Sequence, residues 1–147
     1  MKMLLLLVVA PRYFHQPMLH HLSFCVADLA RSAAFYDAAL SPLGYVRAWE
    51  DATAVGYGAP GGGDKFAIRL VPGAVTVPGQ GFHAAFAAPS REAVDHFYAA
   101  ALGHGGRDNG APGLCPEYGK DYYAAFVIDP DGYRIEAVIN KPAHDGD

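Results

Sequence analysis

Cysteine, long apolar runs and excess basic charge are all scarce in this sequence, and each scarcity excludes a class of protein. The two cysteines, Cys25 and Cys115, are too few for a disulfide scaffold, and neither lies in a C-x-x-C pair. We therefore expect reduced thiols in a cytoplasmic protein. The formal net charge of −4, with 11 basic and 15 acidic residues and no basic run, argues against nucleic acid as a partner. A small molecule is the expected ligand.

The apolar run near the N-terminus, from Met3 to Ala10, is too short to cross a membrane, because a membrane helix needs about 20 residues. Behind Lys2 the run has the length of a signal-peptide core, but Pro11 disfavours cleavage there. We interpret residues 1–17 as an N-terminal extension that is dispensable for activity, with a signal peptide as the alternative. No membrane partner is expected.

One stretch of the chain, from Leu19 to Leu40, occurs twice. A shift of 62 positions places His21 on His83, and the aromatic and apolar residues that follow also match. In each copy an alternating pattern changes to a helical period after a capping residue, Asp28 or Ser90. The repeat therefore predicts a strand followed by a helix in each copy, with the two histidines on the strand face that is turned away from the helices.

The remaining residues complete two similar modules within one domain, residues 18–147. Asp129-Pro-Asp-Gly132 is predicted to be a hairpin turn, and the Gly-rich segment before Lys65 is a hairpin loop, because it lacks the G-x-x-x-x-G-K-[ST] pattern of phosphate loops. Strands are expected at residues 45–50, 53–57, 65–71, 122–128 and 133–139. Each module is thus β-α-β-β-β, over about residues 18–72 and 79–140.

The segment from Gly105 to Asp121 is rich in Gly and Pro and too long for a plain hairpin turn. Long irregular loops in compact domains often cover binding sites. We therefore predict that this segment is a lid, in which Tyr118 and Lys120 contact a substrate, and we add Tyr123 from the strand that follows as a third contact.

Two such modules, opened by HLSFCVADLARSAAFY and closed by FVIDPDGYRIEAV, resemble the vicinal oxygen chelate superfamily of glyoxalases, bleomycin-resistance proteins and extradiol dioxygenases. The resemblance implies an α+β fold, in which the curved mixed sheets of two tandem βαβββ modules enclose a cavity and the helices lie outside. It also implies metal ligands on the first and last strand of each module. The corresponding positions here are His21, Arg69, His83 and Glu136.

Three of these four residues can bind a divalent metal, which we expect to be Zn, Ni, Mn or Fe(II). His21 and His83 with Glu136 form a set of two imidazoles and one carboxylate, and Glu136 could also move a proton as the catalytic residue. Taken alone, His21 could instead be a hydrogen-bonded core histidine. His20 matches Phe82 in the second module, so we interpret it as structural.

Arg69 cannot coordinate a metal, because its guanidinium stays protonated. Either it pairs with Glu136 or another carboxylate and suppresses the metal site, or it binds the anionic end of a substrate. We favour the second role.

The expected function is a metal-dependent, glyoxalase-like lyase or isomerase that chelates a small oxygenated substrate. A ring-cleaving extradiol dioxygenase is one alternative, and a non-enzymatic drug- or metabolite-binding protein is the other. The resemblance further implies a homodimer, and it leaves open whether His21 and His83 meet within one chain or across the dimer.

Overall fold

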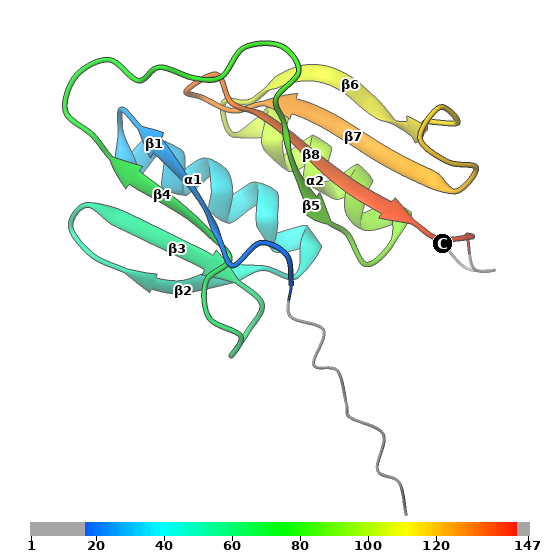
Figure 1. The fold of residues 1–147 in the computed structure, drawn as a ribbon, viewed down its shortest axis with the longest axis horizontal. Coiled ribbons are helices and arrows are strands. Elements are labelled where there is room, and N and C mark those ends of the chain that lie inside the picture. The colour runs from blue at the N-terminus through cyan, green and yellow to red at the C-terminus, as the bar shows by residue number, and fades with distance from the viewer. Residues whose placement is uncertain (1–16, 144–147) are drawn as a thin grey trace, which may run out of the picture.

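The structure of the chain, a computed structural model, describes residues 17–143. Almost the whole predicted N-terminal extension lies outside the described residues. Two modules with the same order of elements follow each other along the chain, from blue to red in Figure 1. The first contains β1 (Leu22–Val26), α1 (Leu29–Leu40), the 3-10 helix η1 (Ser41–Leu43), β2 (Val46–Glu50), β3 (Ala54–Gly58) and β4 (Phe66–Leu70). The second contains β5 (Ala84–Ala87), α2 (Arg91–Gly103), β6 (Arg107–Leu114), β7 (Tyr122–Ile128) and β8 (Arg134–Asn140).

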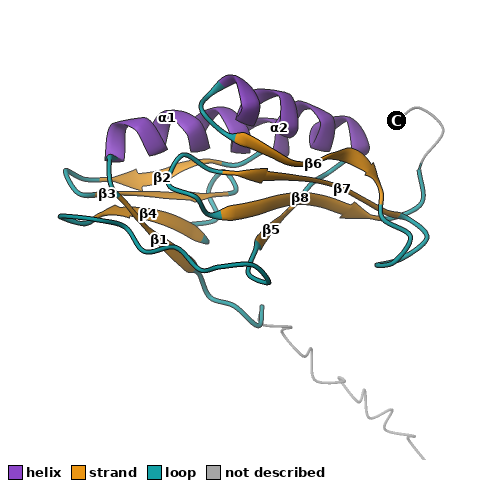
Figure 2. Cartoon of the chain, turned by 90° about the horizontal axis from the view of Figure 1, so that it is seen from above, coloured by secondary structure: helices purple, strands orange, loops and turns teal. Residues whose placement is uncertain are grey.

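Each module forms its own mixed sheet of four strands, and the two sheets share one topology. The strand orders are β1-β4-β3-β2 and β5-β8-β7-β6, and the first pair in each order is parallel while the others are antiparallel. Figure 2 shows α1 and α2 in one layer and the strands in the other. The predicted α+β fold of two βαβββ modules is confirmed, although both sheets remain open and do not close around a cavity within one chain.

Both predicted helix caps are present. The Asp28 carboxylate accepts the Arg31 backbone N–H at 3.0 Å before α1, and the Ser90 hydroxyl accepts the Ala93 N–H at 3.1 Å before α2. Each cap satisfies an N–H group that has no partner within its helix.

A single hydrophobic core joins the two modules. Phe24 of β1 stacks on Tyr133 at a ring-centroid distance of 4.1 Å, and Phe66 of β4 meets Phe86 of β5 edge to face at 5.2 Å. Such aromatic pairs contribute about 0.5–1.5 kcal/mol each beyond the area they bury. The two modules are therefore halves of one folding unit.

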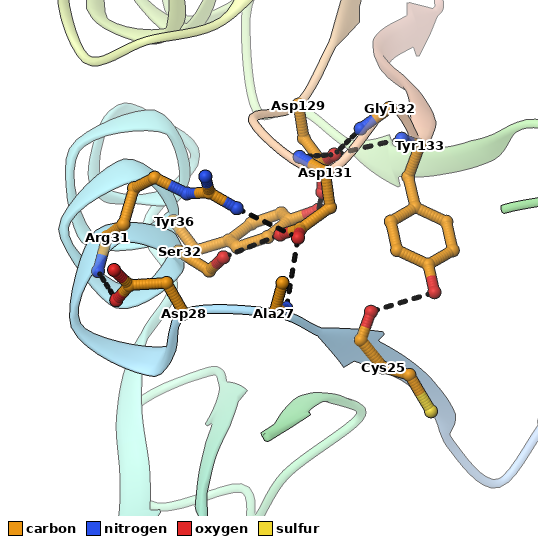
Figure 3. Close-up of polar contacts among 10 residues, drawn as sticks. All are labelled: Cys25, Ala27, Asp28, Arg31, Ser32, Tyr36, Asp129, Asp131, Gly132 and Tyr133. Atoms are coloured by element: carbon orange, nitrogen blue, oxygen red, sulfur yellow. Dashed lines mark hydrogen bonds and ion pairs between the residues drawn. The ribbon is translucent and has the colours of Figure 1, made fainter. Parts of the chain in front are cut away.

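Asp131, in the hairpin turn between β7 and β8, reaches across to the first module (Figure 3). Its Oδ1 accepts the Ala27 backbone N–H at 3.0 Å and Arg31 Nη2 at 2.9 Å, and its Oδ2 accepts the Ser32 hydroxyl at 2.7 Å. The side chain is only 2% exposed. A carboxylate of the second module thus holds the N-terminal end of α1.

Asp129, two residues earlier, completes this connection. Its Oδ1 accepts three backbone N–H groups of the turn, those of residues 131, 132 and 133, each at 2.9 Å. Its Oδ2 accepts the hydroxyl of Tyr36 from α1 at 2.6 Å. Burial raises the pKa of Asp129 in spite of these bonds, which act in the opposite direction. We refer to Asp129 and Asp131 together as the inter-module clamp.

The prediction of a long lid was wrong for its first half. Arg107–Leu114 forms β6, which pairs with β7, and only residues 115–121 remain as a loop. The register shifts twice along β6, around Gly110. Gly and Pro are tolerated in edge strands that carry bulges. The Gly and Pro content therefore led to the prediction of a loop where the structure has a strand. The remaining loop stays a predicted lid.

Candidate functional site

Glu136 is the most unusual residue of the second sheet, because its carboxylate is entirely buried on β8. Its neighbours Ile135 and Ala137 belong to the hydrophobic core, so the alternation of a strand places Glu136 on the sheet face turned away from the helices. The repeat predicts the same face for His21 and His83. Burying a charged carboxylate is costly unless donors or a cation compensate it.

Only one of the two Glu136 oxygens has a hydrogen-bond donor. Oε1 accepts the Tyr122 hydroxyl at 2.5 Å. Oε2 is buried and has no hydrogen-bond partner among the residues that the structure describes. This atom is therefore free to bind a cation or a proton.

His83, directly before β5, lies against that free oxygen. Its Nε2 is 2.9 Å from Glu136 Oε2, although the contact lacks the geometry of a hydrogen bond. Two ligand atoms about 2.1 Å from one ion lie about 3.0–3.4 Å apart, for octahedral to tetrahedral angles. The observed separation is close to that of two adjacent metal ligands. Two of the three predicted ligands are thus side by side.

Tyr122 belongs to this site, although its neighbour Tyr123 was the residue predicted from the sequence to contact a substrate. Phe126 pairs with Glu136 across the hairpin, so Tyr122, four residues earlier, shares the face of the carboxylate. Ala124 lies between them on that face and leaves room for the Tyr122 ring. The predicted turn fixes this register, and strand alternation alone could have identified Tyr122.

Tyr123 lies on the opposite face. Its hydroxyl donates to Asp95 of α2 at 2.8 Å, and the Arg91 guanidinium lies 5.2 Å from its ring centroid. Its side chain packs against the core. The structure thus places Tyr123 beside a helix and away from Glu136.

His21, the third predicted ligand, lies directly before β1, in the position equivalent to that of His83. Its Nδ1 is 2.9 Å from the Nδ1 of His20, and the two rings meet edge to face. Within residues 17–143, no three His, Cys, Asp or Glu side chains are grouped closely enough to hold a metal. The described residues of one chain therefore provide His83 and Glu136 together, and His21 apart from Glu136.

Arg69 is exposed on β4 and does not reach Glu136, whose close polar neighbours are Tyr122 and His83. Its charge is one of the factors that lower the pKa of Asp51, after the hydrogen bonds that Thr53 donates to that carboxylate. The structure thus places Arg69 near the β2–β3 turn of its own module.

The two predicted lid residues are exposed. Tyr118 is 62% exposed, and its ring centroid lies 5.3 Å from that of Tyr122. The Lys120 ammonium is 3.9 Å from the Asp121 carboxylate. Tyr118 is therefore connected to the Glu136 site through Tyr122, whereas Lys120 points to solvent.

A cavity of about 560 Å³ lies between the modules, at the start of β1 and β5. His21 and His83 both line it, together with His20. Its wall is mostly apolar, and its aromatic members are Tyr45, Tyr57, Phe66, Phe82 and Phe86. Cavities of this size and composition hold small organic ligands.

A comparison of the sequence with known protein families agrees with this geometry. The sequence model of the Glyoxalase/Bleomycin resistance protein/Dioxygenase superfamily matches residues 18–137. The chain belongs to this superfamily. Members of the superfamily bind small molecules, often form dimers and commonly use divalent metals. No curated protein sequence matches the chain significantly.

Solved structures of the superfamily share the fold. A glyoxalase/bleomycin resistance protein from Albidiferax ferrireducens T118 is 34% identical, with a TM-score of 0.72, over 86% of this chain and 100% of that chain. A glyoxalase-related enzyme from Fulvimarina pelagi is 19% identical, with a TM-score of 0.65, over 84% of this chain and 89% of that chain. A bleomycin resistance determinant encoded on the transposon Tn5 is 20% identical, with a TM-score of 0.55, over 82% and 95%. The last two show the fold alone.

None of the helices that the structure describes is long and apolar enough to cross a membrane.

Proposed function

We propose that this superfamily member is a metal-dependent, glyoxalase-like enzyme in which His83 and Glu136 hold a divalent ion and His21 supplies the third ligand. The observation that carries the proposal is the buried Glu136 Oε2, which has no hydrogen-bond donor within residues 17–143 and lies 2.9 Å from His83 Nε2. An imidazole nitrogen beside a carboxylate oxygen is a donor set that suits Zn, Ni, Mn or Fe(II).

When bound, such an ion would polarise adjacent oxygens of a small substrate. The chain's own residues then have distinct roles. Tyr122 holds Oε1 of Glu136 by its hydroxyl and so fixes the orientation of the carboxylate. Oε2 accepts no hydrogen bond from the residues that the structure describes, so it is the oxygen that can hold the ion or accept a substrate proton. The buried strand keeps bulk water away from this carboxylate.

His21 lines the same cavity as His83, but the structure does not group it with Glu136. Because superfamily members often form dimers, we propose that His21 of one copy meets His83 and Glu136 of a second copy. In a symmetric dimer, each of the two sites would then take one ligand from one subunit and two from the other.

Metal titration by calorimetry tests the proposal. Wild-type protein stripped with a chelator should bind Zn²⁺ or Mn²⁺ tightly, and Glu136→Gln and His83→Ala should each lose at least 10-fold in affinity. His104→Ala is the matched control, because His104 contacts the carbonyl of Ala100 at the end of α2 and does not line the cavity. Equal affinity in the wild type and Glu136→Gln would exclude the proposed site.

Mixing two inactive variants tests whether the site is shared. His21→Ala and Glu136→Gln, unfolded together and refolded at equal concentration, should regain about a quarter of the wild-type metal sites if the ligands come from two copies, because half of the dimers are hybrids with one intact site. If all ligands come from one chain, the mixture should regain none.

Binding of a small molecule without catalysis is the second candidate function, and the apolar cavity favours it. In that case His83 and His21 would be polar lining, and purified protein would bind ligands but no metal. An extradiol dioxygenase would consume oxygen after addition of Fe(II) and a catechol. A glyoxalase-like enzyme would not, so this measurement distinguishes the two.

A further inference from the structure

Among the described residues that line the cavity between the modules, lysine is the only side chain other than histidine that can carry a charge near neutral pH. Lys65 lines it, and no Asp or Glu is among its described lining residues. Lys65 forms no ion pair with any acid within residues 17–143. A cavity with a cation and no carboxylate favours a ligand with a negative charge.

The backbone holds Lys65 in place independently of its side chain. Its N–H donates to the Tyr57 carbonyl at 2.8 Å, and its carbonyl accepts the Leu22 N–H at 2.9 Å. Lys65 is thus fixed between β3 and β1, directly before β4, while its side chain is exposed. A substitution of this side chain should leave the fold intact.

The rest of the wall is suited to an apolar body. Phe66, Phe82 and Phe86 line the cavity, and its volume is about 560 Å³. Aromatic walls bind flat or chain-like apolar groups by burying their surface. His21 and His83 line the same space, so an oxygenated end of the ligand near them would lie close to the proposed metal ligands.

We propose that this cavity takes an anionic small molecule with an apolar body, an aryl or alkyl carboxylate, whose carboxylate is held by Lys65. The inference rests on the proposed function for the reacting end of the molecule, and it names the substrate class. It also replaces Arg69 by Lys65 as the residue that recognises the anion, because Arg69 does not line the cavity.

Three probes with the same phenyl ring and four-carbon chain test the charge preference: 4-phenylbutyrate, 4-phenylbutanol and 4-phenylbutylamine. Calorimetry on the full chain, with a chelator present, should show the carboxylate binding tightest and the amine weakest. Lys65→Gln should weaken the carboxylate about 3- to 5-fold and leave the alcohol unchanged. Lys65→Glu should reverse the order, so that the amine binds more tightly than the carboxylate. Lys141→Gln, at an exposed lysine that does not line the cavity, should change none of the three.

Equal affinity of the wild type for all three probes, or no binding of any of them, would overturn the inference. An unchanged carboxylate affinity in Lys65→Gln, with unchanged alcohol binding as proof of an intact cavity, would overturn it as well. Metal titrations of the same samples measure the proposed function separately. If Glu136→Gln loses metal binding while the wild type binds all three probes equally, the proposed ligand class is wrong and the metal site stands. If the wild type prefers the carboxylate probe but binds no metal, the metal-dependent function is wrong and the ligand class stands.

Discussion

Two regions of the second module bury carboxylates, and they differ in how the oxygens are satisfied. In the inter-module clamp, both oxygens of Asp129 and both oxygens of Asp131 accept hydrogen bonds from described residues. In Glu136, Oε1 accepts one bond and Oε2 accepts none within residues 17–143. All three side chains are almost completely buried.

The difference separates a structural role from a binding role. A buried acid whose oxygens are all satisfied stabilises the fold, and removing it leaves several donors without a partner. A buried acid with a free oxygen costs stability, and such a cost is typical of sites that gain a ligand. Burial alone would have grouped Glu136 with the clamp.

Removing the clamp carboxylate should have the largest effect on stability. Asp131→Ala leaves the Ala27 N–H, the Ser32 hydroxyl and the Arg31 guanidinium without their acceptor, so we expect a loss of about 3 kcal/mol in unfolding free energy. Urea unfolding measures it. Asp121→Ala, at a more exposed acid that is 3.9 Å from the Lys120 ammonium, is the control and should change the value by less than about 0.5 kcal/mol. Similar losses of unfolding free energy in Asp131→Ala and Asp121→Ala would contradict a structural role for the clamp carboxylate.

Neutralising Glu136 should instead increase the stability of the protein. In the metal-free protein, Glu136→Gln removes a buried charge and gives His83 an amide donor, so we expect a gain of about 1 kcal/mol in unfolding free energy. Tyr122→Phe is the matched variant, because it removes the one donor that Oε1 has among the described residues and should cost about 1 kcal/mol. Thermal unfolding with a chelator present compares the two. A loss of stability in Glu136→Gln would mean that the carboxylate is structural after all.

The clamp should also show a smaller, pH-dependent effect. The pKa of Asp129 is raised above its ordinary value of 3.8, so the folded protein holds this proton more tightly than the unfolded chain does. This contribution to stability is fully present below pH 3.8 and is lost as the pH rises through the raised pKa. Asp129→Asn keeps an acceptor for the turn N–H groups and should flatten this part of the profile. Urea unfolding at a series of pH values tests it, and identical profiles in the two proteins would contradict it.

The sequence predicted the parts of this molecule that follow local rules. The shift of 62 positions located both modules, because strand alternation and the caps Asp28 and Ser90 are properties of short segments. The strand β6 was missed because its Gly and Pro residues and its bulges resemble a loop. The clamp was missed because it depends on contacts between residues about 100 positions apart.

The site was predicted less completely for a physical reason. His83 lies directly before β5, and Glu136 is on β8, which pairs with β5. The strand order within one module was therefore enough to bring them together. His21 and Arg69 belong to the other sheet, and the arrangement of two open sheets does not follow from the repeat. Tyr122 could have been found from the hairpin register, whereas the role of Lys65 required the cavity.

Anomalous diffraction from crystals of the full chain grown with Zn²⁺ would show whether Glu136 Oε2 binds a metal. We expect a peak about 2.0–2.2 Å from both His83 Nε2 and Glu136 Oε2, with a ring nitrogen of His21 from a second copy as a further ligand. Crystals of Glu136→Gln, grown in the same way, should lack the peak. A peak only at the His20–His21 pair, or none within reach of Glu136 Oε2, would contradict the claim that this free oxygen is a metal ligand.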